Sequence, residues 1–274
     1  MTPRGTAALV ARLRRDLGER DLAVLDSLQR VRLLTTDQIR RLHFAENAVR
    51  AQSRRTRELL RRLHGLKLIV RLGRQIGGIK AGSSGYVFGL TGLGLSVLDV
   101  PIGQRRRRTV WEAKPYFQDH MLAVSELYVR LVETSRASDT DLLAFDAEPA
   151  CWRRFTGSGG EPITLKPDAF VRVGIGDYEL ASFVEIDLGT ESLPTIRRKC
   201  QVFLSYWRSG VEQQRHGVFP RVVWLVPDQH RVDGIAGVLT RFTRDALGAL
   251  FTVAQVEHGA DLLTTLPADG GGGS

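Results

Sequence analysis

The segment from Glu46 to Leu63 has the 3.6-residue periodicity of an amphipathic helix, and the two faces of that helix differ in chemistry. The first face is mainly apolar and consists of Val49, Thr56, Leu59, Leu60 and Leu63. The opposite face is basic and consists of Arg50, Arg54, Arg57 and Arg61, with Arg55 and Arg62 beside them. Like charges four residues apart on a helix repel each other, so this face is best stabilised by a polyanion. The segment therefore predicts a helix that packs on a core and binds a polyanion.

Two predicted helices precede the basic helix. The first runs from about Asp21 to Leu33, with leucines and a valine at helical spacing. The second begins after Thr35, a residue suited to cap a helix, and Gln38 completes a capping box three residues later. This short helix is expected to end near Phe44.

A predicted hairpin follows the basic helix. Its strands, Leu68–Leu72 and Tyr86–Leu90, flank a loop that contains Gly, Ser and Lys, and Thr91–Leu98 is expected to add a short helix. Helix, short helix, helix and hairpin is the order typical of a winged helix-turn-helix. We therefore predict this fold over residues 1–100.

A helix-turn-helix places its recognition helix in the major groove of DNA. Arginines on that helix can donate to guanine, and they release counterions when they neutralise phosphates. Arg74 and Lys80 lie at the predicted wing tip, where they suit a flanking phosphate or the minor groove. We therefore predict double-stranded DNA as the partner, and the predicted DNA-binding residues are Arg50, Arg54, Arg55, Arg57, Arg61, Arg74 and Lys80.

The charge of the chain is divided between its two parts. Residues 1–110 contain 23 Lys and Arg against 8 Asp and Glu, a net charge of +15, whereas the remainder has a net charge of −6. This asymmetry favours a polyanionic partner for the first part only. We predict a basic linker over 101–110, with Arg105–Arg108 in a row, a second domain over 111–268 and a flexible Gly/Ser tail over 269–274.

Several classes of protein are excluded by composition. No stretch of about 18 apolar residues is present, so no membrane partner is expected. The N-terminal residues lack the apolar segment of a secretory signal. Two cysteines, Cys151 and Cys200, are too few for a disulfide framework and have no zinc-ligand spacing. A cytoplasmic protein is the simplest interpretation.

Helices and strands alternate through the second domain. The predicted elements are a helix over Tyr116–Glu133, strands over Leu142–Glu148, Leu165–Val173 and Leu180–Leu188, a helix over Pro194–Arg208, a strand over Arg221–Val226, a helix over Val232–Leu247 and a strand over Phe251–Val256. Residues 156–161 are rich in turn formers. The order of these elements predicts an α/β core with a mixed sheet covered by helices on both faces.

Carboxylates gather at two predicted strand ends. Asp168 follows Lys166 and Pro167 at the start of one strand, while Glu185 and Asp187 point to the same face near the end of the next. Three converging carboxylates favour Mg²⁺, which prefers oxygen ligands, so the predicted metal ligands are Asp168, Glu185 and Asp187. A lysine could orient the attacking water or stabilise the phosphate, so the predicted catalytic residues are Asp168, Glu185 and Lys199.

This arrangement resembles the PD-(D/E)xK nuclease-like fold, over 166–199 for the motif and 116–256 for the order of core elements. The resemblance departs from that fold at Asp187, which stands where the fold has a lysine, so that Lys199 would be a migrated lysine. The expected fold class is thus α+β or α/β, a winged helix-turn-helix followed by a mixed-sheet nuclease-like domain.

The whole chain resembles the replication-relaxation family of plasmids and integrative elements. The residues that carry this resemblance are Leu34–Ile39, Phe88–Thr91 with Gly94, His120–Leu127, Lys166–Asp168 and Phe183–Asp187. The resemblance implies a role in mobile-element replication, DNA topology or transfer, and it leaves the biochemical activity open.

Three functions remain open from the sequence. The first is a DNA-binding protein whose nuclease-like domain is inactive and serves contact with DNA, a second copy of the chain or other mobile-element proteins. The second is an active Mg²⁺-dependent DNA endonuclease. The third is a winged-helix transcriptional regulator whose acidic second domain dimerises or binds a ligand.

Overall fold

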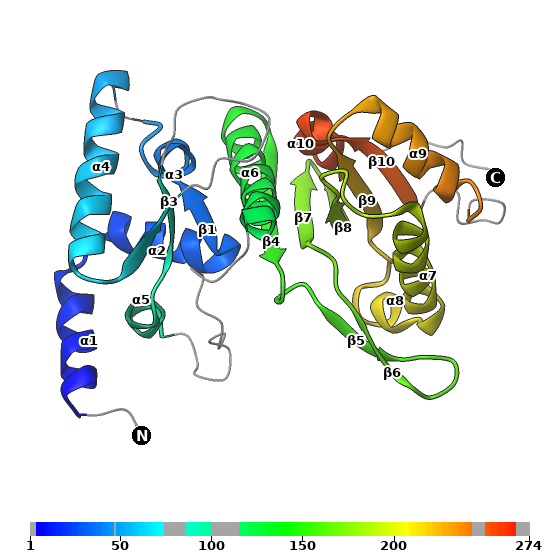
Figure 1. Cartoon of the computed structure of the whole chain (residues 1–274), viewed down its shortest axis with the longest axis horizontal. Helices are drawn as coiled ribbons and strands as arrows, with labels where there is room; N and C mark the ends of the chain where they lie inside the picture. The colour runs from blue at the N-terminus through cyan, green and yellow to red at the C-terminus, as the bar shows by residue number, and fades with distance from the viewer. Residues whose placement is uncertain (1–3, 47, 74–85, 100–114, 243–249, 267–274) are drawn as a thin grey trace. The chain divides into compact units, whose positions relative to one another are not determined.

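The computed structural model describes residues 4–46, 48–73, 86–99, 115–242 and 250–266, and the chain divides into two compact units, Met1–Val129 and Arg130–Ser274. Figure 1 shows the labelled elements of both units. The predicted linker over 101–110 and the predicted tail over 269–274 lie outside the described residues. In the parts that are described, no helix is long and apolar enough to cross a membrane.

The first unit combines helices with a small antiparallel sheet. Its elements are α1 (Arg4–Asp16), α2 (Glu19–Val31), β1 (Leu33–Thr35), α3 (Thr36–His43), α4 (Val49–Gly65), β2 (Ile69–Leu72), β3 (Val87–Leu90) and α5 (Gly92–Val97). The strand order is β1-β3-β2, with Leu34 opposite Phe88 and Val70 opposite Gly89. The sheet is therefore three-stranded, because β1, which the sequence pattern did not predict, pairs with the hairpin.

Local signals explain several boundaries in this unit. Thr35 caps α3 by accepting from the Gln38 backbone amide at 3.1 Å, and the Gln38 side chain accepts from the Thr35 amide at 2.9 Å. The predicted capping box is confirmed. Helix α4 begins at Val49 rather than at Glu46, and Glu46 forms an ion pair with Arg20 instead. Helix α1 was not predicted, although it packs through the buried Leu13.

Helix α6 (Pro115–Ala137) opens the second half of the chain, as its sequence predicts. Its residues up to Val129 belong to the first unit. Met121 packs with Leu33 and Val87 in an apolar cluster, and the Ser125 hydroxyl donates to the Leu33 carbonyl at 2.6 Å. The first compact unit thus includes part of the helix that was expected to open the second domain.

The second unit is built on a mixed five-stranded sheet, as predicted. Its elements are β4 (Thr140–Ala147), β5 (Arg153–Thr156), β6 (Pro162–Leu165), β7 (Ala169–Ile175), β8 (Tyr178–Ile186), α7 (Leu193–Ser209), α8 (Val211–His216), β9 (Arg221–Val226), α9 (Gln229–Leu239), β10 (Phe251–Gln255), a 3₁₀ turn (Val256–His258) and α10 (Gly259–Leu263). The strand order is β10-β9-β8-β7-β4. Strands β8, β9 and β10 run parallel, while β7 is antiparallel to β8 and to β4.

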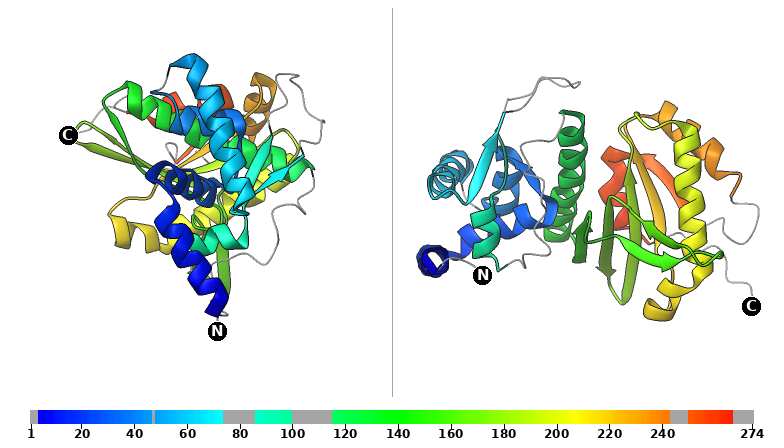
Figure 2. Two further views of the ribbon diagram at one scale, coloured as in Figure 1. Left: turned by 90° about the vertical axis from the view of Figure 1, so that its left-hand side faces the viewer. Right: turned by 60° about the horizontal axis from the view of Figure 1, so that its bottom comes forward.

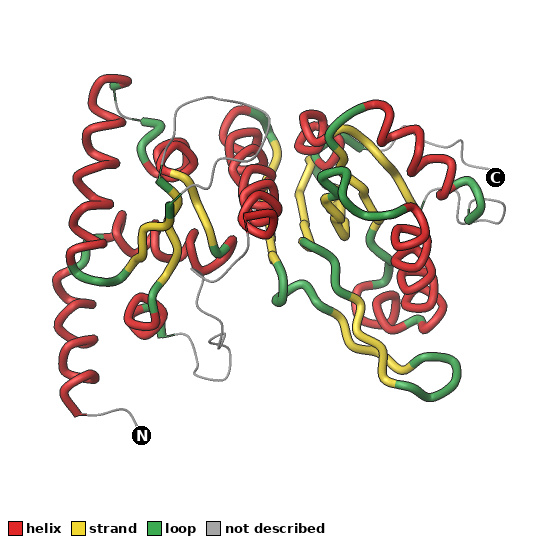
Figure 3. The backbone as a smooth tube through the Cα atoms, viewed as in Figure 1, coloured by secondary structure: helices red, strands yellow, loops and turns green. Residues whose placement is uncertain are grey.

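One sequence prediction in this unit is confirmed in part and another is wrong. The segment at 156–161 does contain a turn, but the two strands that flank it, β5 and β6, were not predicted, and they form a two-stranded sheet of their own (Figure 3). The strand predicted over Leu165–Val173 is two strands, because β6 ends at Leu165 and β7 begins at Ala169. Pro167 lies between them, and proline has no amide to donate to a sheet. Asp168 therefore lies at the start of β7.

Helices α7 and α9 pack on the same face of the five-stranded sheet (Figure 2). Phe203 of α7 and Ile235 of α9 share an apolar cluster with Phe183 of β8 and Trp224 of β9, all of them fully buried. Residues two apart in a strand share a face, so Glu185 lies on the same face as Phe183. The site described below is on this face.

Candidate functional site

The basic face of α4 is exposed along its length. The structure buries the opposite face, which includes Gln52, Thr56, Leu59, Leu60 and Leu63. All five arginines predicted on α4 as DNA-binding residues are exposed, namely Arg50, Arg54, Arg55, Arg57 and Arg61. Arg74 and Lys80, predicted at the wing tip, lie outside the described residues.

Two of the exposed arginines, Arg54 and Arg57, contact residues of their own helix. The Arg54 Nε lies 3.8 Å from a carboxylate oxygen of Glu58 in an exposed pair, and the Arg57 Nε donates to the Ser53 carbonyl at 3.0 Å. An exposed pair of this kind contributes little stability because water and salt screen it. These guanidinium groups can therefore turn to another anion at small cost.

Arg62 has a different role from its neighbours. Its guanidinium donates to Asp21 Oδ1 at 2.5 Å, and the Asp21 side chain is only 1% exposed. The second carboxylate oxygen of Asp21 accepts from the Gly18 amide at 3.1 Å. Arg62 thus ties α4 to the start of α2. The sequence pattern placed Arg62 beside the basic face, and it could not show that Arg62 has a buried partner.

A second contact fixes α4 against α3. Arg40 of α3 donates to the side-chain oxygen of Gln52 at 2.6 Å, and Gln52 is buried on α4. Arg40 also pairs with Asp37 at 2.8 Å. Gln52 was not singled out from the sequence, because an isolated glutamine has no pattern that marks it as a contact between helices.

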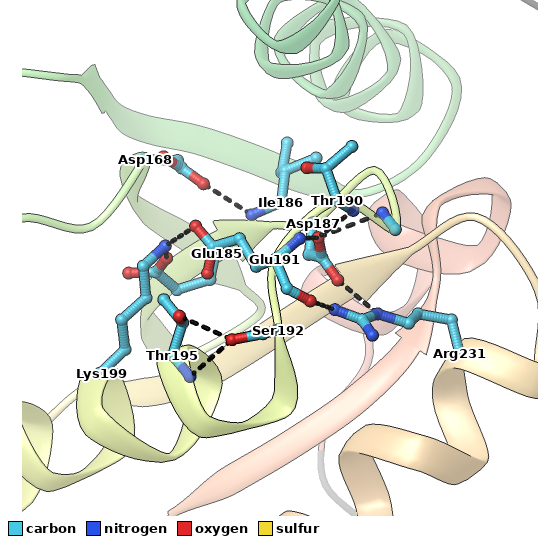
Figure 4. A network of polar contacts seen from close by, with 11 residues as sticks. Asp168, Glu185, Ile186, Asp187, Thr190, Glu191, Ser192, Thr195, Lys199 and Arg231 are labelled. Carbon is cyan, nitrogen blue, oxygen red and sulfur yellow. Dashed lines mark hydrogen bonds and ion pairs between the residues drawn. The ribbon is translucent and has the colours of Figure 1, made fainter.

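The predicted carboxylates of the second unit meet where β7 begins and β8 ends. Ala169 pairs with Val184, and one step further along this antiparallel register brings Asp168 opposite Glu185. Both side chains are buried. Asp168 Oδ2 accepts from the Ile186 backbone amide at 2.7 Å (Figure 4). Asp168 therefore has a structural hydrogen bond in addition to any chemical role.

Lys199 reaches this corner from α7. Its ammonium donates to Glu185 Oε2 at 2.9 Å and lies 2.7 Å from Glu191 Oε1, so that it bridges a sheet residue and a loop residue (Figure 4). It also lies 5.6 Å from the centre of the Trp224 ring. The structure thus brings Asp168, Glu185 and Lys199 together. Glu191 joins them although the sequence pattern did not mark it.

Asp187 follows β8 and holds the next loop. Its Oδ1 accepts from the backbone amides of Gly189, Thr190 and Glu191 at 3.1 to 3.2 Å. Its Oδ2 accepts from Arg231 of α9 at 2.5 Å. Both oxygens of this buried carboxylate are thereby engaged by donors of the protein itself, and these contacts anchor the loop between β8 and α7.

Glu185 and Lys199 shift each other's pKa values. Burial raises the pKa of Glu185 above its ordinary value, the negative charge of Asp168 raises it further, and Lys199 opposes both. Burial by itself would lower the pKa of Lys199, but its contacts with Glu185 and Glu191 raise that pKa above the ordinary value. Lys199 therefore stays charged at neutral pH.

Asp168 and Glu185 are oxygen donors of the kind that a hard divalent cation prefers. Among the described residues, no group of three or more His, Cys, Asp or Glu side chains is arranged to hold a metal ion. Mg²⁺ often needs only one or two carboxylates, because water and substrate phosphates complete its coordination. Asp168 and Glu185 supply two such carboxylates at adjacent strand ends. Lys199 supplies a cation beside them.

Comparison with known proteins identifies the family. The fold and the two groups of residues above describe a two-unit protein with an exposed basic helix and a buried carboxylate–lysine corner. Residues 25–222 match the replication-relaxation family, so the match covers more than half of the chain. The chain belongs to the replication-relaxation family. A search of curated proteins found no match.

Proposed function

We propose that this protein is a cytoplasmic double-stranded-DNA-binding protein that acts in the replication, topology or transfer of a plasmid or other mobile element. In this proposal the first unit is a winged helix-turn-helix, α3 and α4 are its helix pair, and α4 is the recognition helix. Membership of the replication-relaxation family supports a role in replication. The exposed basic face of α4 is the observation that carries the proposal.

The packing of α4 suits this role. Gln52, which is buried, and Arg62, whose partner Asp21 is buried, hold the helix through Arg40 and Asp21, while Arg50, Arg54, Arg57 and Arg61 are exposed. A helix held in this way presents its arginines from a fixed backbone, which reduces the entropy lost on binding. Phosphate contacts then supply affinity, and contacts to bases supply specificity.

A salt titration of duplex binding tests the proposal. Replacing Arg54 and Arg57 with alanine should lower affinity by one to two orders of magnitude, and should reduce the slope of log K against log salt by about one unit per lost phosphate contact. The matched control is Arg208→Ala with Arg215→Ala, which removes the same charge from exposed positions of the second unit. Unchanged slopes in the α4 variant would contradict the proposal, as would equal losses in both variants.

We propose a second function for the second unit, which is Mg²⁺-dependent cleavage of DNA by a PD-(D/E)xK nuclease-like fold. The observation in its favour is Lys199 at 2.9 Å from Glu185, since this lysine can stand in for the one that Asp187 replaces. Asp168 and Glu185 would hold the ion, which would activate water and stabilise charge on the phosphate. Asp187 is left out of this ligand set because it anchors the loop.

Cleavage of supercoiled plasmid with Mg²⁺ or Mn²⁺ tests this second function. Loss of cleavage in Glu185→Gln, with duplex binding unchanged, would support it. Equal rates in wild type and Glu185→Gln would contradict it. In that case the second unit would be an inactive nuclease-like scaffold for contact with DNA or with another protein.

A further inference from the structure

The Lys199 ammonium lies between the carboxylates of Glu185 and Glu191, a position that would suit an inorganic cation. The ammonium is within 2.9 Å of an oxygen of Glu185 and within 2.7 Å of an oxygen of Glu191. Glu185 is 2% exposed, and the Lys199 side chain is 33% exposed. The positive charge that offsets the buried carboxylate is therefore supplied by the protein itself, on a side chain that still reaches solvent.

The two carboxylates that share this ammonium are held in different ways. Glu185 lies on β8, in register with Trp224 of β9. Glu191 lies on the loop that Asp187 anchors through three backbone amides, and Arg231 also donates to the Glu191 carbonyl. Because the loop is fixed independently of the ammonium, Glu191 keeps its position when the lysine moves.

A lysine is well suited to exchange between two such partners. Its ammonium is a compact charge on a flexible stem with several rotatable bonds. A small rotation of that stem could take the ammonium away from Glu185 while it still contacts Glu191. The ion pair with Glu185 would then be lost, and the pair with Glu191 would be kept.

We propose that the Lys199 ammonium acts as an internal cation in the carboxylate corner formed by Asp168, Glu185 and Glu191. A divalent ion would bind Asp168 and Glu185 only after the ammonium has left Glu185 and kept its contact with Glu191. This inference rests on the proposed metal role of the second unit, and it adds that the Lys199 ammonium and the metal ion compete for Glu185. Glu191 is then a positioning residue, because it acts through Lys199 and does not hold the metal ion. The Asp187–Arg231 anchor keeps Glu191 ready to receive the lysine.

Electrostatics sets the direction of the effect. An ammonium beside Glu185 repels a divalent cation at the same carboxylate, and two such charges a few ångströms apart interact strongly at the effective dielectric of a protein site. Removing the ammonium should therefore strengthen metal binding. Removing the charge of the alternative partner, Glu191, should keep the ammonium beside Glu185, where it repels the metal ion and weakens metal binding. The two substitutions have opposite expected signs.

Mn²⁺ binding to the full chain tests the competition, with free Mn²⁺ measured by electron paramagnetic resonance and no DNA present. Lys199→Met should bind Mn²⁺ about tenfold more tightly than wild type, since one positive charge is gone. Lys199→Arg, the matched control that keeps the charge, should bind as wild type does. Glu191→Gln should bind Mn²⁺ several-fold more weakly than wild type. This variant is expected to fold, because it keeps the ion pair between Lys199 and the buried Glu185.

The outcomes separate the competition from the metal role. If wild type binds Mn²⁺ and Lys199→Met binds equally or more weakly, the competition is refuted while the metal role stands. If neither protein binds Mn²⁺ at millimolar concentration, the metal role and the competition both fail. Should Lys199→Met fail to fold, Glu191→Gln decides alone, because unchanged or tighter binding in that variant also refutes the competition.

Discussion

Arg231→Ala should destabilise the second unit strongly, because it leaves the buried Asp187 carboxylate without its cation. Asp187 is 1% exposed and Arg231 is 17% exposed, so the pair is shielded from water. Removing one partner of a buried ion pair costs about 3 to 5 kcal/mol. Three backbone amides still donate to Asp187. We therefore expect a loss at the lower end, about 3 kcal/mol of unfolding free energy.

The matched control is Arg172→Ala, which breaks an exposed arginine–carboxylate ion pair in the same unit. Arg172 donates to both carboxylate oxygens of Glu179, at 2.5 and 2.9 Å, but the two side chains are 40% and 47% exposed. An exposed pair typically contributes less than about 1 kcal/mol. Arg231→Ala should therefore cost several times more than Arg172→Ala.

Urea unfolding followed by tryptophan fluorescence provides the measurement. Three of the four tryptophans, Trp152, Trp207 and Trp224, lie in the second unit, so the signal reports mainly on that unit. Equal losses of unfolding free energy in the two variants would refute the reasoning. Such a result would mean that the loop after β8 does not depend on the Asp187–Arg231 pair.

Two further predictions concern the carboxylate corner. Asp168→Asn keeps an oxygen that can accept from the Ile186 amide, so the metal-free melting temperature should stay the same or rise, while the stabilisation by Mg²⁺ or Mn²⁺ should disappear. A lower melting temperature with no metal effect in either protein would make Asp168 purely structural. Burial and the charge of Asp168 raise the pKa of Glu185 above 4.5, so the folded state holds this proton to higher pH than the unfolded chain, and stability should fall as the pH rises from 4.5 towards the raised pKa. Glu185→Gln should flatten that part of the stability curve measured by urea unfolding, and an unchanged curve would show that Glu185 does not titrate in this way.

Features that depend on neighbouring residues could be predicted from the sequence. The capping box of Thr35 and Gln38 links residues three apart, and the turn at Gly176 and Asp177 joins adjacent strands. Gly176 adopts a φ of +54°, which favours glycine. The division of α4 into a basic face and a mainly apolar face follows from helical periodicity alone, and so does the burial of Leu63. Such patterns depend on short-range geometry that the order of residues already defines.

The roles of individual charged residues were decided only by tertiary structure. Glu185 and Asp187 are two residues apart, which is the spacing of neighbours on one face of a strand. Asp187 nevertheless anchors a loop through Arg231, which lies 44 residues away in the sequence. Arg62 resembles the other arginines of α4, but it pairs with Asp21, 41 residues away. Whether a charge is solvated or paired depends on which elements pack together, and no local pattern encodes that. The sequence could therefore indicate where carboxylates and arginines gather, whereas the contact of α4 with Asp21 of α2 and the contact of α9 with Asp187 after β8 determined what Arg62 and Asp187 do.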